Sequence, residues 1–135
     1  LDGDWCWNMN PFRVTDETRA MVLDNLTGTL SRFLACPELD YVIFGWVMHQ
    51  PEIARDILAR LELENARLRQ FTLLSSEQTL CRRIEADIRA GLRGGDALAR
   101  SLEYLSAYGR QNTVKIMTDG LSPRQSAETI VRQME

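Results

Sequence analysis

The stretch that decides the predicted fold is Tyr41–Val47, Y-V-I-F-G-W-V, a continuous apolar run without a charged residue. Such a run is typical of a β-strand that is buried on both faces of a parallel sheet. The weaker strand candidates are Leu1–Trp7, Arg69–Leu74 and Thr113–Thr118. Segments with helical periodicity separate the four candidates, and this alternation is typical of a sheet covered by helices. We therefore expect an α/β fold with a doubly wound parallel sheet and flanking helices.

Capping residues mark where the helices between these strands begin. The expected helices start near Asp16, Pro51, Ser75, Asp96 and Ser122. The first should run from about Asp16 to Ala35, where Cys36-Pro37 stops it. The third has Ser75 and Gln78 in capping-box spacing, and the last has Ser122 and Gln125 in the same spacing. One face of the last helix is expected to point inward, with Ala127, Ile130, Val131 and Met134.

The composition indicates one globular domain and excludes several classes of function. The 135 residues are 44% hydrophobic and 26% charged, and the net charge of -3 leaves no positive excess for binding nucleic acid. No apolar run approaches the roughly 20 residues that span a bilayer, and no signal peptide is visible. The three cysteines form no metal or disulfide pattern, which favours reduced thiols in the cytoplasm.

Four segments, in this order and spacing, resemble the P-loop small-molecule kinases, such as the shikimate, gluconate, adenylylsulfate and nucleoside-monophosphate kinases. Leu1–Asp4 is similar to the end of the family's second strand, and Tyr41–Val47 to its third. Leu73–Arg83 is similar to the fourth strand and the arginine-bearing helix of the lid, and 113–130 to the last strand, the adenine loop and the final helix. The resemblance implies a kinase that uses ATP and Mg²⁺ to phosphorylate a small-molecule acceptor.

The chain departs from that family at the phosphate-binding loop. The string G-x-x-x-x-G-K-[ST] does not occur in it, and Gly94-Gly95 is followed by Asp96 rather than by lysine. Because residue 1 is Leu and the strand expected before Leu1–Asp4 is missing, we expect an absent N-terminal strand, loop and helix of roughly 30 to 40 residues. We expect a single domain with a lid-like helical region at about 76–108, inactive without that loop.

Acidic and amide side chains cluster at the start of the chain. By the resemblance, Asp4 would be the base or anchor for the acceptor, with Asp2 as its neighbour, and the substrate-binding residues would be Asn8, Asn10 and Arg13. A carboxylate at a strand end can accept the proton of an attacking hydroxyl. From the residues alone, Asp2-Gly3-Asp4 is equally well an exposed turn. The aromatic residues Trp5, Trp7 and Phe12 could line the acceptor pocket, although core packing is the commoner use of aromatic side chains.

A second group of candidates lies in the C-terminal half. The resemblance makes Arg82 catalytic and assigns lid and phosphate contacts to Arg83, Arg89 and Arg93. The alternative for each arginine is a solvated helix face. Thr118, Asp119 and Leu121 would lie beside the adenine. The sequence shows no cluster of metal ligands, and a role for His49 stays open.

Two other interpretations remain for the chain as a whole. One is a non-catalytic nucleotide- or protein-binding module with a degenerate kinase fold, which would be favoured over the enzyme if no phosphate loop is encoded upstream. The other is a mainly helical protein in which the weak strand candidates are misread. Neither the acceptor nor the oligomeric state can be inferred from the residues.

Overall fold

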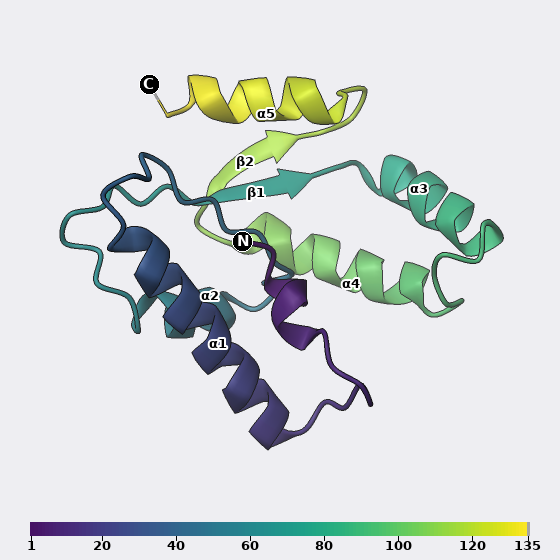
Figure 1. The fold of residues 1–135 in the computed structure, drawn as a ribbon. Helices are drawn as coiled ribbons and strands as arrows, with labels where there is room; N and C mark the ends of the chain where they lie inside the picture. Colours follow the sequence, from purple (N-terminus) through teal and green to yellow (C-terminus); the bar gives the residue numbers. More distant parts are fainter. Residues whose placement is uncertain (135) are drawn as a thin grey trace. The chain divides into compact units, whose positions relative to one another are not determined.

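The computed structural model describes residues 1–134, which form two compact units divided between Leu68 and Arg69 (Figure 1). The first contains the 3₁₀ helix η1 (Gly3–Trp7) and the helices α1 (Asp16–Leu34) and α2 (Pro51–Leu58). The second contains β1 (Phe71–Leu74), α3 (Glu77–Arg89), α4 (Ala97–Arg110), β2 (Val114–Met117) and α5 (Pro123–Arg132).

The first unit is built on the apolar stripe of α1. Leu26 and Leu30 of α1 form its buried core together with Ile57 of α2. The partly buried side chains around this core are Leu1, Cys6, Leu23, Val42, Phe44, Trp46, Met48, Ile53 and Leu61. Helix α1 begins at a reciprocal capping box between Thr15 and Thr18, and Asp16 and Glu17 lie at its positive N-terminal end.

The prediction that Tyr41–Val47 and Leu1–Trp7 are strands of a sheet is wrong. The two segments meet at a single parallel bridge, between Asp2 and Gly45, and Gly3–Trp7 then turns into η1. The Asp2 side chain accepts a hydrogen bond from the Asp4 amide and so caps η1, which competes with continued strand pairing. The run at 41–47 is apolar, and its side chains are alternately exposed and partly buried. A β-strand also needs a series of backbone hydrogen bonds to a neighbouring strand, and this segment has a single bridge.

The second unit contains a pair of parallel strands. Phe71 of β1 lies opposite Val114 of β2, and the pairing continues in register to Leu74 and Met117. Parallel strands require a crossover connection, which α3 and α4 provide. Figure 1 shows α4 on one side of this strand pair and α5 on the other. Residues 76–108, expected to be a lid-like helical region, contain α3 and most of α4, which pack against each other, and their role as a lid stays a prediction.

The predicted doubly wound parallel sheet is therefore wrong for this chain. Residues 1–134 are mostly helical, and their only sheet is the two-stranded β1–β2 pair. Of the four strand candidates, Arg69–Leu74 and Thr113–Thr118 contain the observed strands. These two segments are also connected by a side-chain hydrogen bond between the hydroxyls of Thr72 and Thr113.

The only lysine of the chain, Lys115 of β2, caps the C-terminal end of α4. Its ammonium group donates hydrogen bonds to the carbonyl oxygens of Tyr108 and Gln111 and to the Thr113 hydroxyl, at 2.6 to 2.8 Å. A positive charge at this end of a helix complements the helix dipole. Burial lowers the pKa of Lys115. This contact joins the end of α4 to the strand that follows it.

The helix boundaries expected from capping residues are largely confirmed. Helices α1 and α2 begin at Asp16 and Pro51, and α5 begins after Ser122 with the predicted reciprocal capping box. The start of α3 differs by one residue, because the cap is the Ser76 hydroxyl, which accepts from the Thr79 amide. The inward face predicted for α5 is wrong at two of its four residues, because Ala127 is exposed and Val131 is 56% exposed.

Candidate functional site

The backbone amide and the side-chain carboxylate of Asp4 each form one hydrogen bond. Its amide donates to the Asp2 carboxylate at 2.9 Å, and its Oδ1 accepts a hydrogen bond of 3.0 Å from the indole Nε1 of Trp46. Gly3, immediately before it, is buried, and a Cβ at this position would lie 2.4 Å from Cγ of Trp46. The close approach of the Trp46 ring therefore requires glycine at position 3 and fixes the orientation of the Asp4 carboxylate.

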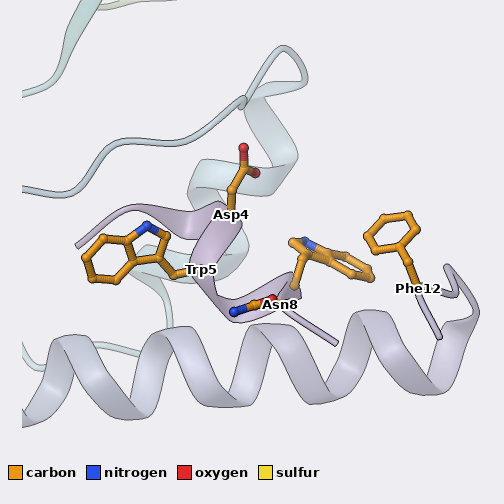
Figure 2. A pocket seen from close by; sticks show the side chains of 5 residues that line it. Asp4, Trp5, Asn8 and Phe12 are labelled. Carbon is orange, nitrogen blue, oxygen red and sulfur yellow. The ribbon is translucent and has the colours of Figure 1, made fainter. Parts of the chain in front are cut away.

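An open hollow of about 550 Å³ lies beside this carboxylate. It is lined by Asp4, Trp5, Trp7, Asn8 and Phe12 (Figure 2). Figure 2 shows Asp4, Trp5 and Asn8 projecting from η1 and its end, with Phe12 on the segment that leads into α1. The rings of Trp7 and Phe12 are 5.9 Å apart and tilted by 52°. The hollow thus combines apolar ring surface with a carboxylate and an amide.

Two of the three aromatic side chains of this hollow, Trp5 and Phe12, are exposed to solvent, and Trp7 is partly buried. Trp5 is 75% exposed and Phe12 is 66% exposed. Large exposed aromatic surface next to polar groups is typical of binding surfaces. The core packing that is commoner for aromatic residues is therefore not seen for Trp5 and Phe12, and their role in an acceptor pocket stays a prediction.

The structure brings together only part of the site predicted in the N-terminal segment. Asp4 and Asn8 line the hollow, whereas Asp2 acts as the cap of η1. Asn10 and Arg13 follow along the chain, are exposed, and do not line it. The residue that sequence reasoning missed is Trp46, 42 positions from Asp4. No local pattern identifies that contact, since Trp46 was expected inside a buried strand.

The arginines predicted for the lid and phosphate have separate surroundings in the second unit. Arg83 of α3 donates to the hydroxyl and the carbonyl oxygen of Thr118, and Arg93 forms an ion pair of 2.8 Å with Asp87. Arg82 and Arg89 are exposed and take part in no ion pair with residues 1–134. Of these four arginines, only Arg83 therefore links α3 to the end of β2.

Asp119, predicted beside the adenine, binds the start of α3. Its carboxylate accepts hydrogen bonds from the amide of Ser76 at 2.8 Å and from the Ser76 hydroxyl at 2.5 Å. The hydrogen bonds from the Ser76 and Thr79 hydroxyls and from the Ser76 amide lower the pKa of Asp119 to about 2. The carboxylate thus occupies the positive N-terminal end of α3, a position that could otherwise bind an anion.

The other two adenine-side candidates also belong to the connection after β2. The Thr118 hydroxyl donates to the carbonyl oxygen of Leu74, which joins the ends of the two strands. Leu121 is partly buried and follows Gly120, whose φ of +69° favours glycine. Residues 74–76 and 118–121 therefore form a hydrogen-bonded junction that we call the strand-end junction.

Asp119 is expected to make the stability of the second unit depend on pH. Because its folded pKa is depressed, its contribution is present above the unfolded value near 3.8 and is lost as the pH falls toward about 2. Asp119→Asn should remove that part of the pH dependence and should be less stable than the parent at neutral pH. Urea unfolding followed by circular dichroism at pH 6, 4 and 2.5 would measure both. Parallel profiles for parent and variant would contradict this role.

The described residues contain neither a metal site nor a membrane-spanning helix. Among residues 1–134, no group of His, Cys, Asp or Glu side chains has the arrangement of a metal site. No helix in this part of the chain has the length and apolar character needed to cross a bilayer. No family model, curated protein or solved structure matches the chain. The interpretation of its function therefore depends on its own residues.

Proposed function

We propose that this chain binds the small-molecule acceptor of an ATP-dependent phosphotransferase in the hollow beside Asp4. The observation that carries the proposal is the Asp4 carboxylate, oriented by the Trp46 indole at a hollow lined by exposed rings and the Asn8 amide. Asp4 Oδ2 forms no hydrogen bond with any described residue. That oxygen is therefore available to accept the proton of an attacking hydroxyl. The ring faces would bind the apolar parts of the acceptor.

The ATP and Mg²⁺ side of the reaction rests on the family resemblance. Phosphoryl transfer proceeds mainly by positioning and charge stabilisation of the phosphates, which a glycine-rich loop and its lysine provide in P-loop enzymes. The 135 residues contain no such string. We therefore expect isothermal titration of this chain with Mg²⁺-ATP to show no binding. Tight binding of Mg²⁺-ATP would require a phosphate site of a different kind and would contradict the proposal that these residues bind only the acceptor.

Trp5→Ala should weaken acceptor binding by about two- to tenfold, because a stacked aromatic ring contributes about 0.5–1.5 kcal/mol beyond its buried area. The parent and the variant would be titrated with a panel of small hydroxyl compounds, namely amino alcohols, sugar acids and nucleosides, by ligand-observed NMR. Trp5 is exposed, so its removal should leave the fold intact.

Tyr41→Ala is the matched control for Trp5→Ala. Tyr41 is an aromatic residue of the same unit, is 72% exposed and does not line the hollow. Its removal should leave the affinity for the compounds unchanged. If both variants lose affinity equally, or if no compound of the panel binds the parent, the hollow is not an acceptor site.

The second candidate function is that of a non-catalytic module that binds another protein in the cytoplasm. The observation that favours it is the apolar surface of 41–47, where Tyr41, Ile43 and Val47 are exposed outside the hollow. Exposed apolar patches of this kind are typical of interaction surfaces. A chain that binds a partner through this surface and no compound in the hollow would support this candidate over the first.

A further inference from the structure

The segment 41–47 has one exposed and one partly buried face. Tyr41, Ile43 and Val47 are 72%, 80% and 51% exposed. The residues between them are partly buried against the core of the first unit, and they are Val42, Phe44 and Trp46. This alternation is the side-chain pattern of an extended strand. One face of the segment therefore belongs to the core, and the other is apolar and uncovered.

The backbone of this segment is paired along one edge only. The carbonyl oxygen of Ile43 accepts from the amino group of Leu1, and the amide and carbonyl of Gly45 bond to Leu1 and Gly3, at 2.7 to 3.1 Å. Alternate residues of an extended chain direct their backbone groups to opposite edges. The second edge consists of the amides and carbonyls of Val42, Phe44 and Trp46, which form no backbone hydrogen bond within residues 1–134.

Nothing on this second edge opposes pairing with another strand. From Tyr41 to Met48 there is no charged residue and no proline. Natural proteins block open edges with lysine, proline or bulges, and an edge without them is a template for pairing. The edge therefore accepts a further strand without burying a charge.

The side chains of the segment are complementary to those of a second, antiparallel copy. With a twofold axis at Phe44, Val42 would pair with Trp46 and Tyr41 would lie opposite Val47. Ile43 would lie opposite Gly45, where the space in which a Cβ would project holds no atom within 4 Å. The most exposed apolar side chain of the segment would thus cover the open space of the glycine. In the dimer, the pairs 42–46 and 44–44 would be the ones joined by backbone hydrogen bonds. These are the residues whose backbone groups have no backbone partner in the single chain.

We propose that the edge formed by Val42, Phe44 and Trp46 pairs with the same edge of a second copy of this chain. The result is a symmetric dimer with an antiparallel strand pair about Phe44, an isologous interface of the commonest oligomer type. The inference goes beyond the phosphotransferase proposal and does not depend on it. The hollow beside Asp4 uses the indole of Trp46, whereas the dimer uses its backbone.

Sedimentation equilibrium of the full chain tests the dimer. At micromolar concentration we expect twice the 15.5 kDa mass of one chain. Ile43→Lys should raise the dimer dissociation constant at least about tenfold, since it places two like-charged side chains next to the shared strand pair. Leu92→Lys is the matched control, because Leu92 is 75% exposed in the other unit, and it should leave the dissociation constant unchanged. Circular dichroism would verify that both variants keep the parent's helix content.

A monomeric parent chain would overturn the proposal, and so would a dimer that Ile43→Lys leaves intact. Disulfide trapping tests the register independently. In a chain with Cys6, Cys36 and Cys81 replaced by serine, a mixture of the Ile43→Cys and Gly45→Cys variants should form a cross-linked dimer. Each variant alone should cross-link at least about tenfold less, because in this register position 43 lies opposite 45 and neither position lies opposite itself. Equal cross-linking by Ile43→Cys alone would reject pairing about Phe44.

Discussion

Leu26→Ala is expected to lower the free energy of unfolding by about 3 kcal/mol, the usual cost of removing a buried leucine side chain and leaving a cavity. Leu26 has no exposed surface and contacts Leu30 and Ile57 in the core of the first unit. Alanine is at least as good a helix former as leucine, so α1 itself should not be weakened. The loss therefore measures packing between α1 and α2.

Urea unfolding followed by circular dichroism measures this loss, with Met21→Ala as the matched control. Met21 lies on the same helix but is 43% exposed, so its truncation should cost less than about 1 kcal/mol. Equal losses for the two variants would mean that α1 does not pack as the structure has it.

Gly3→Ala is expected to cost about 1–3 kcal/mol and to disturb the candidate site at the same time. The added Cβ would lie 2.4 Å from Cγ of Trp46 and 2.7 Å from two further ring atoms. These atoms belong to a ring that is packed against the core, so the indole must move as a whole. Its hydrogen bond to Asp4 should then lengthen or break. Compounds that bind in the hollow should lose affinity.

The measurement for Gly3→Ala combines urea unfolding with the chemical shift of the Trp46 indole N–H. Gly109→Ala is the control, because a Cβ at Gly109 meets no atom within 4 Å and the residue lies inside α4. Because Gly109 lies in the last turn of α4, this change should be neutral or stabilising by less than about 1 kcal/mol. An unchanged Trp46 indole signal in Gly3→Ala would contradict the account of how Asp4 is oriented.

Sequence reasoning succeeded where a structural element depends on neighbouring residues. The starts of α1 and α5 are set by Thr15 and Ser122, whose hydroxyls accept hydrogen bonds from amides three residues later. Pro51 starts α2 for a similar reason, since its fixed φ suits the first turn of a helix. These signals extend over one turn of the chain, so they are visible without knowledge of the tertiary structure.

Sequence reasoning failed where the outcome depends on residues far apart in the chain. An apolar run such as Tyr41–Val47 is suited to a buried strand, but the same run with one bridge to Asp2 remains an extended segment with an open edge. The candidate site shows the same limit. Asp4 and Asn8 could be selected from the first residues, whereas the contact that orients Asp4 comes from Trp46.

The amino-acid sequence by itself determined the position of most helices, the two parallel strand segments at Arg69–Leu74 and Thr113–Thr118, and the acidic and aromatic character of the N-terminal segment. Only the tertiary structure decided that Tyr41–Val47 forms no sheet, that Asp119 binds Ser76 at the start of α3 and that Trp46 donates a hydrogen bond to Asp4. Caps and periodicity act over a few residues, where the chain's own geometry brings partners together. Strand pairing and side-chain contacts between residues about 40 positions apart depend on which segments the folded chain brings together. The composition of a segment does not specify its partner.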